Sequence, residues 1–312
     1  MSRTEDDYAE TMFVASSHDV IMFYTTRGRA YRLKGYEIPE GSRTSKGTNI
    51  VNILPLESEE KISAMIQVPK DDEGMYLCMA TRKGLVKRSS LDIFRNTRRN
   101  GIIAVTLRED DELAWVKLTS GNDDLLVATK KGMCIRFNET DARPLGRAAS
   151  GVKAITLNEG DEVIGMTVMK EEGKLLTVSE TGYGRISENN NYRTQSRGGK
   201  GLKNYHIEKY GEIAAISEIN EEDDIILISQ DGIIIRIPAS AVRICARPSK
   251  GVKVMKLGEG DRVVTLSTTE HDENEVNGEV EDDGSANEGA GDTSGDTPDT
   301  PISDDTQAPT EE

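Results

Sequence analysis

The sequence predicts an all-β protein, a propeller of four-stranded blades, because three kinds of anchor residue recur with a period of about fifty residues. Short apolar runs that end in a glycine turn recur at Gly28, Gly84, Gly132, Gly182 and Gly232. A second glycine follows in every unit, at Gly47, Gly101, Gly151, Gly201 and Gly251. An apolar residue after an acidic loop is the third anchor, at Ile62, Leu113, Val163, Ile213 and Val263. The three anchors keep one phase, so we expect five copies of one structural unit.

Each unit begins with two short β-rich runs around a glycine, as in LLVATKKGMCIRF at 125–137. Two-residue turns of the type RG, KG, TG or DG predict hairpins, since glycine adopts positive φ at little steric cost. A polar stretch, the second glycine and a run such as GVKAITL at 151–157 follow, and an acidic turn precedes a fourth run. Four strands per unit without helical periodicity favour a propeller. A parallel solenoid with long rungs is the alternative.

The acidic excess of this 312-residue chain lies at one end. Sixteen of its 55 acidic residues follow residue 269, where there is no Lys or Arg, so the other 39 acids balance all 39 bases. We therefore expect a β domain over residues 1–268 and a disordered acidic tail over residues 269–312, since the tail is too polar to repay its ordering entropy. The tail is either a solubilising extension or a competitor for the chain's basic loops.

The basic residues recur at one place in each unit, between the hairpin and the second glycine. These five segments, 43–47, 95–101, 143–153, 193–203 and 243–256, are called the rim loops below. Propeller symmetry would place them on one edge of a disc, where they could follow a phosphate backbone with help from exposed glycine amides. The acids gather instead in other turns, at 110–112, 161–162 and 221–224. The opposing interpretation is that each loop is merely solvated; the recurrence favours the phosphate-binding one.

Binding by the rim loops should tolerate any sequence, since they hold few Asn or Gln arranged to recognise base edges. If each loop contacted about two phosphates, roughly ten counterions would be released, and affinity would fall by up to about 10⁵ between 50 and 200 mM salt. A curved rim would also bend its DNA, at a cost of order 1–6 kcal/mol for 40–90°.

Catalytic, metal and cofactor sites are not expected. The histidines, His18, His206 and His271, share no metal-ligand spacing, and the phosphate-loop pattern GxxxxGK[ST] is absent. Three separated cysteines, Cys78, Cys134 and Cys245, indicate reduced core thiols. No apolar run approaches the roughly eighteen residues of a membrane span, and an acidic start after Arg3 does not resemble a signal peptide, so we expect a cytoplasmic protein. Trp115 is expected in the core, and packing is the favoured role for Tyr192 and Tyr205.

Three segments carry a family resemblance: QSRGGKG at 195–201, GRAYRLKGYEIPE at 28–40 and GTNIVNILPL at 47–56. Together with the repeat they make residues 4–268 similar to the C-terminal DNA-wrapping domain of the DNA gyrase A subunit. The resemblance implies a six-bladed β-pinwheel that wraps double-stranded DNA around its basic edge. It also implies a bacterial, nucleoid-associated location and two partners, the rest of the A subunit and the gyrase B subunit, in an isomerase that introduces negative supercoils with ATP. The chain itself would be no enzyme, with its catalytic tyrosine and ATPase elsewhere.

Two departures from the family pattern stand out. The family's basic box belongs to its first blade, whereas here it lies in the fourth visible unit, with Ser196 where a base is usual. Only five units are visible, so the resemblance implies a chain without the first blade, the principal box and the breakage-reunion region. The predicted DNA contacts are Arg43, Lys46, Arg95, Arg98, Arg99, Arg143, Arg147, Lys153, Arg193, Gln195, Arg197, Gly198, Gly199, Lys200, Gly201, Lys203, Arg243, Arg247, Lys250 and Lys253.

Two alternative functions stay open at this point. One is the equivalent domain of topoisomerase IV, the decatenating relative, which generally lacks an intact box. The other is a propeller scaffold for proteins, which would bind duplex DNA either not at all or without regard to salt.

Overall fold

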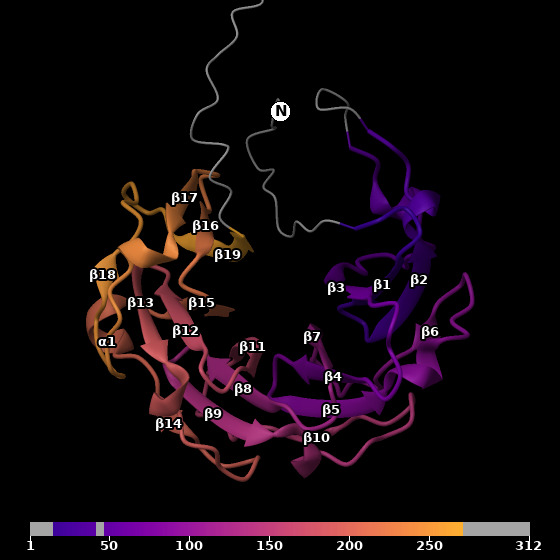
Figure 1. Ribbon diagram of the computed structural model, residues 1–312, viewed down its shortest axis with the longest axis horizontal. Helices are drawn as coiled ribbons and strands as arrows, with labels where there is room; N and C mark the ends of the chain where they lie inside the picture. The colour runs from indigo at the N-terminus through magenta and orange to yellow at the C-terminus, as the bar shows by residue number, and fades with distance from the viewer. Residues whose placement is uncertain (1–14, 42–46, 271–312) are drawn as a thin grey trace, which may run out of the picture. The chain divides into compact units, whose positions relative to one another are not determined.

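The computed structural model describes residues 15–41 and 47–270, which form five antiparallel sheets. Figure 1 shows the sheets following one another around an arc, with β3, β7, β11, β15 and β19 on its inner side. From inner to outer, the strands are β3 (Ile62–Val68), β1 (Val20–Thr25), β2 (Arg29–Lys34) and β6 (Ile102–Ile103); β7 (Leu113–Thr119), β4 (Tyr76–Thr81), β5 (Leu85–Ser90) and β10 (Val152–Lys153); β11 (Val163–Met169), β8 (Asp124–Thr129), β9 (Met133–Asn138) and β14 (Leu202–Lys203); β15 (Ile213–Ile219), β12 (Lys174–Ser179), β13 (Tyr183–Glu188) and β18 (Val252–Lys253); and β19 (Val263–Glu270), β16 (Asp223–Ser229) and β17 (Ile234–Pro238).

Short helical turns connect these strands. One is an α-helical turn, α1 (Ile207–Tyr210). The others are 3-10 turns at Gly35–Glu37, Ile50–Asn52, Leu91–Phe94, Glu139–Asp141, Asn189–Asn191 and Ala239–Ala241. The predicted all-β propeller architecture is therefore confirmed, and the solenoid alternative is wrong for the described strands, because every named pair of strands is antiparallel.

Hairpins form, as predicted, the two central strands of the first four sheets and two of the three described strands of the fifth, but their turns are longer than expected. Three residues, 26–28, separate β1 from β2, and the Gly28 N–H donates to the Thr25 carbonyl oxygen at 2.8 Å. Gly28 has a φ of 74°, and its counterparts in the other hairpins are also left-handed. The two-residue turns predicted from RG and KG are therefore wrong by at least one residue, because the glycine follows a β-turn as the left-handed residue that lets the second strand begin.

The outermost strand of each of the first four sheets comes from the next repeat. Lys153 of β10, for example, pairs with Leu85 of β5 in the preceding repeat. The second glycine makes this crossing possible: Gly151 has a φ of 87°, and a Cβ built there would lie 2.6 Å from the Val86 carbonyl oxygen. The prediction of four strands per blade holds for these sheets, but the fourth strand is exchanged rather than supplied by its own unit. The fifth sheet has three described strands.

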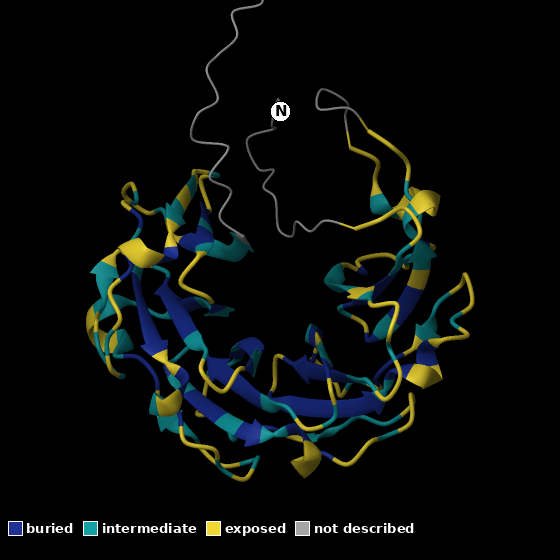
Figure 2. Ribbon diagram, in the orientation of Figure 1, coloured by how far each residue is buried: buried dark blue, intermediate teal, exposed yellow. Residues whose placement is uncertain are grey.

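Hydrophobic side chains fill the spaces between neighbouring sheets. Leu125 and Val127 of β8 pack in one cluster with Cys78 and Ala80 of β4. The second, third and fourth sheets have such a cluster on either side. The first hairpin strand of each, β4, β8 or β12, is therefore buried on both faces and reads as a nearly continuous apolar run, which is dark blue in Figure 2.

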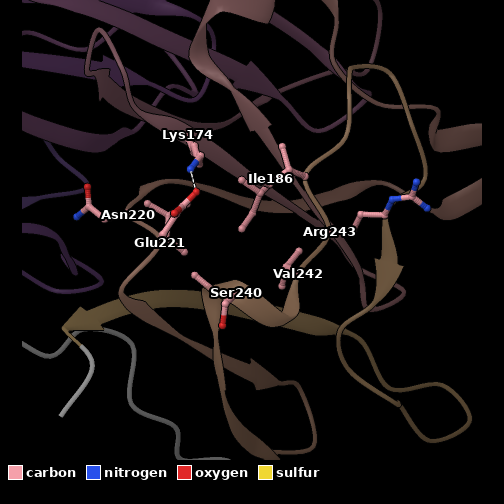
Figure 3. Close-up of a pocket in the computed structure, with 10 residues that line it drawn as sticks. Lys174, Ile186, Asn220, Glu221, Ser240, Val242 and Arg243 are labelled. Carbon is pink, nitrogen blue, oxygen red and sulfur yellow. Dashed lines mark hydrogen bonds and ion pairs between the residues drawn. The ribbon is translucent and has the colours of Figure 1, made fainter. Parts of the chain in front are cut away.

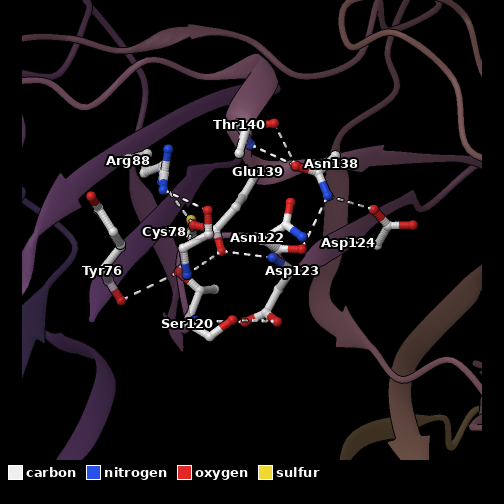
Figure 4. Close-up of polar contacts among 12 residues, drawn as sticks. Tyr76, Cys78, Arg88, Ser120, Asn122, Asp123, Asp124, Asn138, Glu139 and Thr140 are labelled. Atoms are coloured by element: carbon white, nitrogen blue, oxygen red, sulfur yellow. Dashed lines mark hydrogen bonds and ion pairs between the residues drawn. The ribbon is translucent and has the colours of Figure 1, made fainter. Parts of the chain in front are cut away.

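A buried ion pair crosses the joint between the second and third sheets. Arg88 Nε of β5 lies 2.8 Å from Glu139 Oε2, and neither side chain is more than 7% exposed. Glu139 also accepts the N–H groups of Gly121 and Asp123, at 2.8 and 2.9 Å, and the Thr119 hydroxyl at 2.8 Å. Figure 4 shows these groups converging on one carboxylate. A charge so fully enclosed is tolerated because each oxygen has partners.

Candidate nucleic-acid interface

Four rim loops lie on the outer edge of the arc, where each leads into an exchanged strand. The segments 95–101, 143–153, 193–203 and 243–256 precede or include β6, β10, β14 and β18, which Figure 1 places along that edge. Figure 2 shows them mostly exposed or half-buried. The predicted common edge is confirmed for these four loops. In the first rim loop, Arg43 and Lys46 lie outside the described residues.

The exposed basic residues of this edge occupy equivalent positions in successive repeats. Arg143, Arg193 and Arg243 each lie eight residues before the second glycine and are exposed. Further predicted contacts that are exposed are Arg98, Arg99, Arg147, Lys153, Lys200, Lys203, Lys250 and Lys253. Their positive charges therefore follow one curved edge, which is the arrangement needed to neutralise successive phosphates.

Two predicted contacts near this edge are already paired with acids. Arg95 lies 2.8 Å from Asp72 Oδ1 and 2.7 Å from Asp92 Oδ1. Lys203 Nζ lies 3.2 Å from Glu208 Oε1. A phosphate would have to compete with these carboxylates, so both residues are weaker candidates than the exposed arginines.

Arg197 and Arg247 turn part of their guanidinium groups back onto the preceding repeat. Arg197 donates from Nε to the Asp141 carbonyl oxygen at 3.0 Å and from Nη1 to that of Lys153 at 3.1 Å. Arg247 donates to the carbonyl oxygens of Asn191 and Lys203, at 2.7 and 2.9 Å. These two arginines therefore tie one rim loop to the one before it, and a phosphate contact by the same side chains stays a prediction.

The segment QSRGGKG is held against the third repeat through its backbone. The Gln195 N–H donates to the Arg136 carbonyl oxygen at 2.8 Å, and the Gly199 carbonyl oxygen accepts from Thr156 at 2.8 Å. The Gly198 N–H donates to the Ala154 carbonyl oxygen at 2.6 Å. The expectation of exposed glycine amides is therefore wrong for Gly198, because its donor is used inside the protein. Gly201, with a φ of 77°, sits against Cys134 in the way that Gly151 sits against Val86.

Buried cations beneath the rim loops were missed by the sequence analysis. Lys87 of β5 is 1% exposed, and its ammonium donates to the carbonyl oxygens of Ala104 and Arg147, each at 2.5 Å. Burial, with a smaller effect from Arg147, lowers the pKa of Lys87 to about 8. Arg185 of β13 is fully buried and donates to the Ser249 carbonyl oxygen at 3.2 Å. Each therefore fixes the backbone of a rim loop from below.

The acidic turns divide between the two ends of the blades. Asp111 and Asp161 line a cavity of about 650 Å³ together with Arg82 and Lys83 of a hairpin turn. Glu221, by contrast, follows the other end of an inner strand, and it lines a second cavity together with Arg243 of the fifth rim loop. The predicted segregation of charge is therefore wrong for residues 221–224, since strand direction brings that turn beside the start of a rim loop.

The second cavity, of about 410 Å³, lies where a repeated arginine is missing. Arg136 Nε lies 2.8 Å from Asp124 Oδ2, and its Nη1 donates to the carbonyl oxygens of Asn189 and Tyr192, at 3.0 and 3.3 Å. Arg32, Arg88 and Arg236 hold the same position in other repeats, whereas the fourth repeat has Ile186.

Shorter side chains surround Ile186. In Figure 3 it faces the Lys174–Glu221 ion pair across the cavity, and the Arg243 guanidinium points away. Ala239 and Val242, which correspond to Asn189 and Tyr192 in the preceding repeat, line the same space. The cavity therefore occupies the place that corresponds to the Arg136 guanidinium in the preceding repeat.

The remaining candidates have structural surroundings. Tyr192 and Tyr205 are at most 1% exposed and bond to Asn204 and to the Lys250 carbonyl oxygen, so packing is confirmed as their role. Trp115 packs against the core, Cys78 and Cys134 are buried free thiols, and Cys245 is a half-buried one. In the described part of the chain, no group of three or more His, Cys, Asp or Glu is placed to hold a metal ion. Within residues 15–41 and 47–270, no helix is long and apolar enough to cross a membrane.

A family model described as the DNA gyrase C-terminal domain, a beta-propeller, matches residues 19–69, 76–120, 123–168, 173–220 and 223–270. The DNA gyrase A subunit of Clostridium acetobutylicum is 48% identical over 149 residues, which cover 48% of this chain and 18% of that protein. That of Staphylococcus aureus is 48% identical over 151 residues, or 48% of this chain and 17% of that protein. The chain thus matches less than a fifth of the length of these relatives.

Two solved structures share the fold. A DNA gyrase A C-terminal domain superposes with a TM-score of 0.71 and 25% identity, covering 84% of this chain and 89% of that one. The C-terminal domain of a DNA topoisomerase IV gives a TM-score of 0.74 at 24% identity, covering 81% of this chain and 80% of that one. The second likeness concerns the fold alone.

Proposed function

The chain belongs to the DNA gyrase C-terminal domain family, and on that premise we propose that it binds and bends double-stranded DNA for a gyrase A subunit. The observation that carries the proposal is the line of exposed arginine and lysine side chains on one outer edge. Arg143, Arg193 and Arg243 repeat there at equivalent positions, and buried Lys87 and Arg185 hold the loops of Arg143 and Arg243 in place. Repeated cations at fixed spacing match a phosphate backbone rather than any base sequence.

Wrapping follows from the curvature of this edge. A duplex that contacts all four described rim loops must bend around the arc, and smooth bending costs on the order of 1–6 kcal/mol for 40–90°. Several arginines and lysines acting together can offset this cost. The domain has no chemistry of its own in this proposal; it supplies bent DNA to the strand-passing parts of a gyrase, namely the rest of the A subunit and the B subunit. Its place is with the chromosome in the bacterial cytoplasm.

Titration of the chain with a short duplex at several salt concentrations tests DNA binding. We expect the affinity to fall by several orders of magnitude between 50 and 200 mM salt. A weak response to salt, or no binding, would instead favour a protein scaffold. Relaxation of a closed circular plasmid in the presence of the chain tests wrapping, because chirally wrapped DNA retains a change in linking number. A relaxed product despite binding would favour a topoisomerase IV-like role, in which DNA is bound without this chirality.

A further inference from the structure

Two lysines of the fifth rim loop hold their ammonium groups against one tyrosine ring. Lys250 Nζ lies 4.2 Å and Lys253 Nζ 4.8 Å from the centroid of the Tyr183 ring. A second ring, Tyr210 of α1, lies 6.0 Å from Tyr183 and 5.4 Å from Lys250 Nζ. Cations within about 6 Å of an aromatic face are attracted to it. Both lysines are nevertheless exposed, so an external anion can reach them.

Strand register explains part of this arrangement. Tyr183 of β13 pairs directly with Lys253 of the exchanged strand β18, and opposite residues in an antiparallel pair project on the same face. The equivalent pairs in the other sheets are Arg29 with Ile103, Leu85 with Lys153, and Met133 with Lys203. Among these four described pairs, only the fourth sheet sets an aromatic ring opposite a lysine.

The backbone of the same loop is also fixed. The Tyr205 hydroxyl donates to the Lys250 carbonyl oxygen at 2.9 Å, and the Lys253 ammonium donates to the Thr181 carbonyl oxygen at 2.9 Å. The preceding loop differs, because Lys203 is paired there with a carboxylate, that of Glu208. The fifth rim loop thus presents two ordered ammonium groups whose contacts are with neutral groups. In the fourth rim loop, a phosphate must first displace the Glu208 carboxylate from Lys203.

We infer that Tyr183 positions Lys250 and Lys253 as a two-lysine phosphate site, which makes this loop a stronger DNA contact than the loop before it. The inference deepens the proposed function and rests on it. Ordering two lysine side chains costs entropy, and here that cost is met during folding rather than during binding. Both ammonium groups lie within 5 Å of the centroid of the same ring, so their two positive charges can act together on a phosphodiester anion that approaches it.

Duplex affinity of the full chain tests the inference through three variants. Tyr183→Leu installs the residue found at this position in the second sheet, Tyr183→Phe keeps the ring, and Met133→Leu makes a matched change in the third sheet. We expect Tyr183→Leu to weaken binding by about three- to tenfold at low salt, because two cation–π contacts are lost. The other two variants should stay within about twofold of the parent chain.

A double-mutant cycle separates positioning from a general structural effect. In a chain that already carries Lys250→Gln and Lys253→Gln, Tyr183→Leu should have no further effect on affinity. The lysine pair can also be compared alone: Lys250→Gln with Lys253→Gln should cost more affinity than Lys200→Gln with Lys203→Gln. This second comparison changes exposed residues only, so it is readable even if Tyr183→Leu fails to fold.

Three results would overturn the inference while the proposed function stood. They are parent-like binding by Tyr183→Leu, an equal effect of Tyr183→Leu in the chain that carries Lys250→Gln and Lys253→Gln, and equal losses from the two lysine pairs. Failure of the parent chain to bind duplex would overturn both proposals.

Discussion

Arg88 and Glu139 form a buried ion pair across two repeats, with Nε and Oε2 2.8 Å apart and the carboxylate fully enclosed. Because Arg88 lies on β5 and Glu139 begins the 3-10 turn of the next repeat, the pair fixes one blade against its neighbour. Each of the four described rim loops begins within two residues of the end of a 3-10 turn. The angle between neighbouring blades, and with it the curvature of the basic edge, thus depends on contacts of this kind.

Glu139→Gln should lower the free energy of unfolding by about 3–5 kcal/mol, because it leaves the buried Arg88 without its counter-charge. Urea unfolding measures the change. The matched control is Glu112→Gln, which breaks the ion pair with Arg82 but removes a side chain that is 53% exposed. Exposed pairs contribute about 0–1 kcal/mol, so similar losses from the two variants would contradict the structural role given to Glu139.

The cavity beside Ile186 predicts coupling between two substitutions. Ile186→Arg with Lys174→Asp recreates the Arg136–Asp124 pair of the preceding repeat, whereas Ile186→Arg alone sets a guanidinium near the Lys174 ammonium. We expect the double variant to be more stable than the sum of the single effects by on the order of 0.5–3 kcal/mol. Chemical unfolding of the four chains gives the coupling energy, and additive effects would show that the cavity does not accept the repeat's guanidinium.

Gly151→Ala should destabilise the protein by at least about 1–2 kcal/mol, the usual cost of a left-handed conformation for other residues. Its φ is 87°, and the added Cβ would meet the Val86 carbonyl oxygen at 2.6 Å. Gly146→Ala in the same rim loop is the control, since nothing lies within 4 Å of the Cβ built there. Thermal unfolding should separate the two variants, and equal melting temperatures would argue against the strand crossing at Gly151.

The stability of the chain should rise with pH above about 8 because of Lys87. Its folded pKa is lowered to about 8, so between there and the ordinary lysine range the unfolded chain binds more protons than the folded one. Well below pH 8 the Lys87 amine is protonated in both the folded and the unfolded chain, so its contribution to stability no longer changes with pH. The parent chain should therefore gain stability relative to Lys87→Met between pH 7 and 9.5, as followed by urea unfolding. If the parent chain gained no stability relative to Lys87→Met over this pH range, the desolvated environment of Lys87 would be contradicted.

The repeat, the hairpins and the common edge of the basic loops could be predicted from the sequence because glycines and apolar runs recur in phase. The strand exchange could not be predicted, because β6, β10, β14 and β18 are only two residues long and their sequences do not indicate which strand they pair with. From the sequence alone, Lys87 and Arg185 would be taken for solvent-exposed charges, because their burial depends on the rim loops that cover them in the folded chain.

Two further features of the site, the cavity beside Ile186 and the contact of Tyr183 with Lys253, do not follow from the recurrence of glycines and apolar runs. Ile186 had a signal that aligning the repeats would have found: it replaces the arginine that Arg32, Arg88, Arg136 and Arg236 represent. The contact of Tyr183 with Lys253 depends on the register of β13 and β18, which the sequence does not define. Long-range pairing therefore limits what could be predicted at the site, while local turn chemistry accounts for most of what was predicted correctly.

The salt dependence of duplex affinity in two charge-matched triple variants tests the central claim most directly. One variant carries Arg143→Gln, Arg193→Gln and Arg243→Gln on the outer edge, and the other carries Arg82→Gln, Lys83→Gln and Lys131→Gln in hairpin turns. If the outer edge binds the phosphates, the first variant should lose affinity, with a slope of log affinity against log salt lower by about 0.9 for each lost contact, while the second stays close to the parent chain. Equal losses from the two variants, or a greater loss from the hairpin-turn variant, would contradict the account.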